Sequence, residues 1–170
     1  MADRQNAKAL RVIGQDLASL SVAEFSVGRR GDTYTVRFED RTPSQKPDSS
    51  IRGTIRALLG GKEFARPVSK TLHFFTSELI WKDAAHSFNR KGTEEITDLC
   101  ELSLMLRALG DFLDDSESDD FVIFWERNLV KVLFDQREQN FMLVNLYERG
   151  TGLYLKRSNR QQHNILKQAV

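Results

Sequence analysis

The sequence predicts an α+β fold, in which an antiparallel sheet of about six strands carries helices packed on one face. Three observations lead to this prediction. The apolar pattern of residues 10–40 recurs in residues 106–136. Each copy begins with helical spacing and continues with the alternation of strands. A third strand and a closing helix follow in each copy, so a single domain over 1–170 is expected to hold two α-β-β-β-α units, at 4–90 and 93–157.

The internal repeat rests on an alignment at an offset of 96 positions. The identical pairs are Leu10 and Leu106, Arg11 and Arg107, Gly14 and Gly110, Leu17 and Leu113, Phe25 and Phe121, and Phe38 and Phe134. Any two helix-plus-hairpin units would share part of this pattern, so a duplication is an interpretation. At the level of topology alone, the pair resembles duplicated or dimeric α+β binding folds such as TATA-box-binding saddles and secretion-chaperone dimers, although no residue motif of either is present.

A helix is expected at the start of each unit. Apolar residues step by three and four positions in both: Leu10, Ile13, Leu17 and Leu20 in the first, and Leu99, Leu102, Leu106, Leu109 and Leu113 in the second. Thr93 is the candidate N-cap of the second helix. Gly14 and Gly110 lie beside these apolar faces. Because a glycine inside a helix costs about 1 kcal/mol relative to alanine, the matching positions predict close packing of another backbone there.

Strands follow each opening helix. The first hairpin is expected to run over 22–28, turn at GRRGD (28–32) and return over 34–38. The second is expected as FVIFW (121–125), a turn near ERN and LVKVLF (129–134). The third strands are expected at TLHFF (71–75) and NFMLV (140–144), followed by closing helices over 76–90 and 145–156. The second closing helix is the weaker prediction, since Gly150 and Gly152 both oppose it.

A basic insert at 41–70 distinguishes the first half from the second. It contains all three prolines of the chain, which are typical of a loop. The candidate contacts for an anion or a nucleic acid are Arg52, Arg56, Lys62 and Arg66, and the tail 158–170 adds further basic residues. The alternative is a solvated loop whose Ile51, Ile55 and Leu58 fold back on the body.

An acidic stretch from Asp111 to Glu126 distinguishes the second half. Asp115, Glu117, Asp119 and Glu126 have the spacing of positions 1, 3, 5 and 12 of a calcium loop. Such a loop requires glycine at position 6, where this chain has Asp120. The leading interpretation is a solvated acidic turn, and the alternative is pairing with a basic surface. No metal site is predicted.

The outward faces of the two hairpins differ in polarity. The first presents Glu24, Ser26, Thr33, Thr35 and Arg37, which suit water. The second presents Val122, Phe124, Leu129 and Leu133. Because helices are expected on only one side of the sheet, these four residues predict a contact surface, covered either by the insert or by a second copy of the chain. A twofold homodimer through this face is the preferred hypothesis.

No motif in the chain specifies a catalytic chemistry, and no cofactor is predicted. His73, His86 and His163 lack metal-binding spacing, Cys100 is interpreted as an inert thiol, and Trp81 and Trp125 are expected in the core. The net charge of +1 gives no field toward nucleic acid or membrane. The N-terminus lacks the apolar core of a signal peptide and no apolar run approaches the ~18 residues of a membrane span, so a cytoplasmic location is expected. The expected function is a non-enzymatic protein-interaction or adaptor module that self-associates, with nucleic-acid binding through the insert and tail as the alternative.

Overall fold

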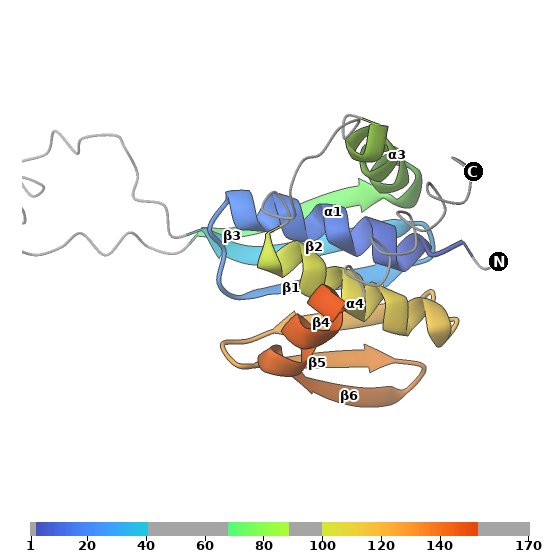
Figure 1. The fold of residues 1–170 in the computed structure, drawn as a ribbon. Helices are drawn as coiled ribbons and strands as arrows, with labels where there is room; N and C mark the ends of the chain where they lie inside the picture. The colour runs from blue at the N-terminus through green and yellow to red at the C-terminus, as the bar shows by residue number, and fades with distance from the viewer. Residues whose placement is uncertain (1–2, 41–67, 89–99, 153–170) are drawn as a thin grey trace, which may run out of the picture.

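The structure, a computed structural model, describes residues 3–40, 68–88 and 100–152. It contains one six-stranded antiparallel sheet with the order β3-β2-β1-β4-β5-β6, covered by helices on one face (Figure 1). The elements are α1 (Gln5–Ser19), β1 (Phe25–Arg30), β2 (Thr33–Asp40), β3 (Val68–Phe75), α3 (Thr76–Phe88), α4 (Glu101–Asp115), β4 (Phe121–Trp125), β5 (Leu129–Phe134), β6 (Arg137–Met142) and a helix over 143–152. The predicted α+β class is confirmed.

The two hairpins meet at the centre of the sheet, where β1 pairs with β4. Val27 lies opposite Ile123 in this pairing, and these residues occupy equivalent positions at the offset of 96. Within the hairpins, Phe25 pairs with Phe38 as its equivalent Phe121 pairs with Phe134. Both hairpins therefore have the same register. A duplication as the origin of this symmetry stays an interpretation.

Helices α1 and α4 cross the centre of the sheet as a close antiparallel pair. A Cβ atom added to Gly14 would lie 2.8 Å from the Cα of Ser103, and one added to Gly110 would lie 2.5 Å from the Cα of Ala7. Only a residue without a side chain allows two backbones to approach this closely. The prediction that each glycine marks close backbone packing is confirmed.

The hydrophobic core lies between this helix pair and the sheet. Leucine and isoleucine side chains of the two helices cover the inward-facing residues of the four central strands. The fully buried side chains of the core include Leu10, Ile13, Leu17, Val27, Tyr34, Val36, Leu106, Leu109, Leu113 and Ile123. Trp125 is also buried and stacks on Phe25 with 5.3 Å between ring centroids, so its predicted core position is confirmed. Leu20 is exposed because α1 ends one residue before it.

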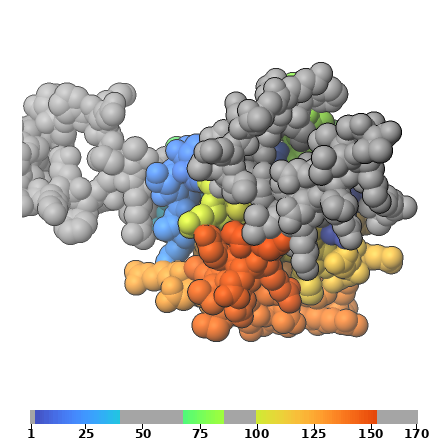
Figure 2. Space-filling view, in the orientation of Figure 1, coloured from blue at the N-terminus to red at the C-terminus, as the bar shows by residue number. Residues whose placement is uncertain are grey.

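The closing helices flank the central pair, one on each side. Helix α3 lies next to α1, where the Nε of Arg11 donates a hydrogen bond to Asp83 Oδ1 at 2.6 Å. The helix over 143–152 lies beside α4 (Figures 1 and 2). Gly150, which opposed the prediction of this helix, allows the contact, since a Cβ there would lie 2.7 Å from the carbonyl oxygen of Leu104.

The turns of both halves correct the predicted strand limits. Strand β1 continues to Arg30, and its turn with β2 is made by Gly31 and Asp32 rather than by GRRGD, because Gly31 takes the positive φ of 59°. Strand β6 begins at Arg137 instead of 140, after a turn in which Asp135 and Gln136 have φ of 47° and 60°. Residues 68–70, which were counted with the insert, begin β3.

The sequence also predicts that Ile80 and Trp81 of the first closing helix match Leu146 and Tyr147 of the second at an offset of 66 positions, and the structure corrects this alignment. Leu79 and Leu146 are the buried residues that match, so the offset there is 67 positions rather than the 66 that pairs Ile80 with Leu146. Trp81 is 70% exposed, and its predicted core position is wrong, because α3 turns Leu79 rather than Trp81 toward the sheet. Thr93 and Leu99 lie outside the described residues.

Candidate interaction surface

The open face of the sheet, defined as the face opposite α1 and α4, carries all four predicted interface residues. Side chains alternate along each strand, so Val122 and Phe124 point away from the helices while Phe121 and Ile123 point toward them. Leu129 and Leu133 lie on the same face of the adjacent strand β5. Phe124 and Leu129 are 39% exposed and Leu133 is 37% exposed. Their role in an interface stays a prediction.

A fifth apolar residue, Met142, extends this group onto β6. It pairs directly with Leu129 across the β5–β6 ladder and is 60% exposed. Sequence reasoning missed it, although the predicted strand over 140–144 includes it, because only the outward faces of the two hairpins were compared. Together, Val122, Phe124, Leu129, Leu133 and Met142 form the apolar patch. Within it, Lys131 lies 3.8 Å from Glu138 as an exposed ion pair.

The other half of the open face, formed by β1, β2 and β3, is polar. Ser26, Thr33 and Thr35 lie there, and the Thr35 hydroxyl is 3.3 Å from His73 Nδ1. Arg30 and Arg37 are exposed on this half and make no ion pair within the described part of the chain. The open face therefore joins an apolar area to a polar area that contains Arg30 and Arg37, with Glu39 beyond Arg37 on the same face.

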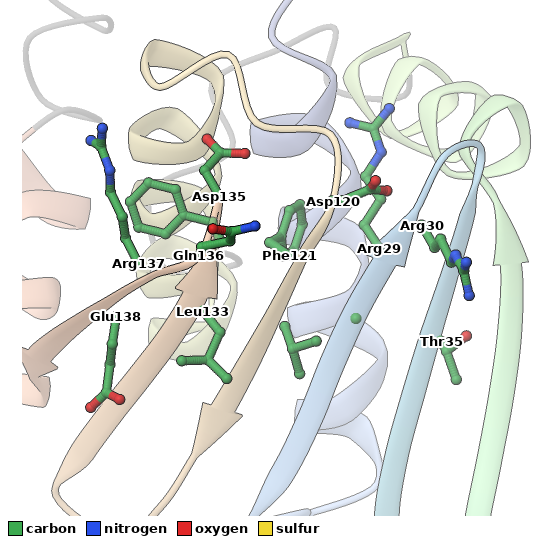
Figure 3. Close-up of a pocket in the computed structure, with 13 residues that line it drawn as sticks. Arg29, Arg30, Thr35, Asp120, Phe121, Leu133, Asp135, Gln136, Arg137 and Glu138 are labelled. Atoms are coloured by element: carbon green, nitrogen blue, oxygen red, sulfur yellow. The ribbon is translucent and has the colours of Figure 1, made fainter.

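A hollow with a volume of about 690 Å³ lies where these two areas meet (Figure 3). Its lining comes from β1, β2, β4, β5, β6 and the adjoining turns, and includes Gly28, Thr35, Val122 and Leu133. No residue of α1 or α4 lines it, because these helices lie behind the sheet. Within the described part of the chain, the hollow is thus an open concavity that no helix covers.

The acidic turn has a structural role that the sequence interpretation missed. Both oxygens of Asp114 accept hydrogen bonds from the first turn of α1, from the backbone N–H of Asn6 at 3.1 Å and from that of Ala7 at 3.0 Å. No side chain of α1 itself caps this end. Since the free N–H groups at a helix start need acceptors, a carboxylate from the end of α4 supplies them. The interpretation as a solvated turn is wrong for this residue.

Buried Asn6 connects the acidic turn to the sheet. Its Oδ1 accepts hydrogen bonds from Arg29 Nη1 and from the Tyr34 hydroxyl, both at 2.6 Å, and its Nδ2 donates to the carbonyl oxygen of Ser118 at 3.1 Å. Arg29 is itself buried and lies 3.3 Å from Asp119. Burial raises the pKa of Tyr34, so its hydroxyl stays a donor. We call Asn6, Arg29, Tyr34 and Ser118 the polar hub.

Two further contacts involve acidic side chains of the same turn. Arg4 forms an ion pair with buried Asp111. Asp120 Oδ1 accepts a hydrogen bond from the backbone N–H of Gly31 at 3.0 Å. The acidic residues thus hold the start of α1 and the β1–β2 turn, and among the described residues no group of three or more His, Cys, Asp or Glu side chains is placed to hold a metal ion.

Replacing Asp114 with alanine is expected to lower the free energy of unfolding by about 1–2 kcal/mol, because two N–H groups at the start of α1 lose their acceptor. Urea denaturation followed by circular dichroism measures this. Glu117→Ala, in the same turn but exposed, is the matched control and should change the free energy by less than about 0.5 kcal/mol. Equal effects of the two substitutions would contradict the capping role.

The pH dependence of Asp114 gives an independent check. Burial raises its pKa more than the hydrogen bonds from Ala7 and Asn6 lower it. The folded state therefore holds this proton more tightly than the unfolded state, so the contribution of Asp114 to stability is largest at low pH and declines as pH rises above 3.8. Asp114→Asn cannot titrate, and the stability of wild type relative to this variant should fall as pH is raised through that window.

The other predicted functional residues are not gathered at the open face. Arg52, Arg56, Lys62 and Arg66, and the tail 158–170, lie outside the described residues. His73 is exposed on β3, and Cys100 is half-buried at the start of α4, where its Sγ lies 3.9 Å from the carbonyl oxygen of Gly14. The structure does not describe the side chain of His86 or any part of His163.

Comparisons with known proteins do not indicate a function, so a functional proposal rests on the geometry of the site. No family model, curated protein or solved structure matches this chain. Within the described residues, no helix has the length and apolar character that crossing a membrane requires. The open face, with its apolar patch and hollow, is the feature on which a functional proposal rests.

Proposed function

We propose that this chain is a non-enzymatic protein-interaction module that self-associates as a twofold homodimer through the apolar patch. The observation that supports the proposal is the position of the patch on a sheet face that the described helices leave uncovered. Sheets with two apolar faces are normally covered on both sides. A second copy would supply the missing layer by packing its own sheet about 10 Å away.

The charges within the patch favour a second copy as its occupant. In a twofold interface the same surface meets itself, so it must be self-complementary. Lys131 and Glu138 have opposite charges on neighbouring strands. In a face-to-face dimer, Lys131 of one protomer can pair with Glu138 of the other, and the reverse pair forms by symmetry.

The size of the patch sets the expected strength of the dimer. Three strands spaced about 4.8 Å apart, each about 20 Å long, cover roughly 300 Å² in projection, and all six strands cover roughly 600 Å². A standard stable interface buries about 800 Å² on each partner. We therefore expect a weak dimer, with a dissociation constant in the range of about 1–100 μM.

Light scattering after size exclusion tests the proposal. Over a loading series from about 1 to 200 μM, the mass should rise from that of the 19.5 kDa monomer toward twice this value. Phe124→Glu should keep the monomer mass throughout, because it puts a charge into the apolar contact. Thr71→Glu is the matched control, since it places the same residue on the exposed β3 part of the open face, away from the patch.

Two results would contradict the homodimer. One is a wild-type chain that stays monomeric at about 200 μM, which would favour the alternative in which residues of the insert cover the patch. The other is a dimer that tolerates Phe124→Glu as well as it tolerates Thr71→Glu. Circular dichroism of both variants must first match that of the wild type.

A further inference from the structure

The hollow follows a row of residues that crosses the open face. The strand registers place one residue of each strand in this row, and we call the hollow along it the trough. From one edge of the sheet to the other, the row contains His73, Thr35, Gly28, Val122, Leu133 and Glu138. Five of the six line the hollow (Figure 3).

Gly28 leaves the floor of the trough without a side chain, and no contact among the described residues requires a glycine there. Its φ is not in the left-handed region, which among the glycines is occupied by Gly31. A Cβ at this position would lie 3.7 Å from the carbonyl oxygen of Phe121 and 3.8 Å from Val122 Cγ2, which are ordinary contact distances. Glycine weakens a central strand and commonly marks a place where a ligand approaches the backbone closely.

The two ends of the trough differ in charge. At the β4–β5 end, Val122 and Leu133 form an apolar floor, and the charged residues Asp120, Asp135, Arg137 and Glu138 line the hollow around it. At the β1–β2 end, Arg30 lies in the next row on one side of Gly28 and Arg37 in the next row on the other side, since they pair with Thr33 and Ser26. Neither arginine has an ion-pair partner among the described residues.

The distances across the face select the shape of the ligand. The rows of Arg30 and Arg37 lie four residues apart along the strands, or about 13 Å, which admits an α-helix of about 10–12 Å diameter between them. Because strands and their adjoining turns line the hollow, the described residues would cover a ligand on one side only. Small-molecule sites cover most of the ligand surface, whereas a helix laid in a groove needs only its apolar face covered.

We propose that the trough binds an amphipathic helix of a partner protein that carries apolar residues at one end and acidic residues at the other. The apolar side chains lie over Val122 and Leu133, and the carboxylates lie over Gly28 and Thr35, between the rows of Arg30 and Arg37. The two ends of the trough are two to three strand spacings apart, about 10–14 Å. At a rise of 1.5 Å per residue, the acidic residues follow the apolar ones by about seven to nine positions.

This ligand and the second copy of the chain compete for the same surface. Val122 and Leu133 belong both to the trough and to the apolar patch, so the two occupants exclude each other. In this respect the inference rests on the proposed function. An acidic helix also neutralises Arg30 and Arg37, which a second copy of the patch leaves unpaired. The homodimer is then the resting form of the module, and the acidic helix is the partner that replaces it.

A fluorescein-labelled peptide of 18 residues provides the probe. It carries three leucines in its first two turns, three glutamates seven to nine positions later, and alanine and glutamine elsewhere. Fluorescence anisotropy with the full chain should give a dissociation constant of about 1–100 μM at low salt, weakening as salt is added. Light scattering should show that the peptide converts the dimer to a monomer–peptide complex.

Exchanging the charges distinguishes specific binding from nonspecific binding. The double substitution Arg30→Glu with Arg37→Glu should weaken binding of the glutamate peptide by about tenfold or more. The same variant should instead bind a matched peptide in which lysines replace the glutamates. Gly28→Leu, which fills the floor, should abolish binding of both peptides. Gly28→Ala is its milder counterpart, and it keeps the proposal testable if the leucine variant fails to fold. Leu20→Glu should leave peptide binding unchanged, because Leu20 is exposed at the end of α1, behind the sheet.

The outcomes distinguish this inference from the homodimer. A monomeric wild-type chain that still binds the glutamate peptide, and loses it on charge reversal, would refute the dimer and support the trough. Equal binding of the glutamate and lysine peptides would overturn the inference, as would binding that is unaffected by both Gly28→Leu and charge reversal. Absence of any binding at about 1 mM peptide, with the dimer intact, would overturn the inference alone.

Discussion

Replacing Asn6 with alanine is expected to lower the free energy of unfolding by about 3–5 kcal/mol. Asn6 accepts from Arg29 and Tyr34 and donates to the backbone of Ser118, all in a buried position. The substitution leaves a buried guanidinium group, a buried hydroxyl and a buried carbonyl without this partner. Each loss costs about 1–3 kcal/mol, and the loss at Arg29 is the largest because hydrogen bonds to charged groups are the strongest, although the ion pair of Arg29 with Asp119 remains.

Two comparisons isolate the hub from a general effect of substitution. Tyr34→Phe removes one hydrogen bond of the hub and should cost about 1 kcal/mol. Asn140→Ala, on exposed β6, should cost less than about 0.5 kcal/mol. Thermal and urea denaturation give the three values. A cost for Asn6→Ala that is no greater than that of Tyr34→Phe would show that Arg29 finds another acceptor and that the hub is not cooperative.

The polar hub was not predicted from the sequence. Strand periodicity places Phe25, Val27 and Arg29 on one face, so the alternation by itself predicts that Arg29 is the third inward-facing residue of β1. It was read as part of a turn because glycine and arginine surround it. Only the positive φ of Gly31, two positions later, fixes the end of the strand. The partner, Asn6, lies on a helix that is remote in sequence, and no local pattern connects the two.

The parts that were predicted well share a physical basis. The apolar steps of α1 and α4 and the alternation of β4 and β5 are local, and each makes one face unsuited to water. The open face followed from the same rule, because a second apolar face on β4 and β5 has no helix to cover it. The turn at Asp135 and Gln136 was not predictable in this way, since neither residue type signals a positive φ as glycine does.

The closing helices show a limit of alignment between the halves. A shift of one residue, from an offset of 67 to 66, exchanges Leu79 for Ile80 as the partner of Leu146. On a helix this rotates the buried face by about 100°. Trp81 was placed in the core by this shift, although it is exposed. The burial of Leu79 depends on how α3 packs against α1, which is tertiary information.

Replacing Gly110 with alanine is expected to lower the free energy of unfolding by about 3 kcal/mol, although the same change in an isolated helix would stabilise it by about 1 kcal/mol. The added Cβ would lie 2.5 Å from the Cα and N of Ala7 and from the carbonyl oxygen of Asn6. All three are backbone atoms, so α1 must move as a body. Helix propensity alone therefore predicts that the substitution raises the free energy of unfolding, whereas packing predicts that it lowers it. Urea denaturation decides between the two.

Other glycines provide a graded control. Gly14→Ala, whose Cβ would lie 2.8 Å from Ser103 Cα, should cost less than Gly110→Ala, and Gly152→Ala, with no atom within 4 Å, should cost almost nothing. A movement of α1 away from Gly110 also displaces Asn6 from the polar hub. The combined variant Asn6→Ala with Gly110→Ala should therefore cost less than the sum of the single variants. Additive costs would show that the close helix contact and the hub are energetically independent.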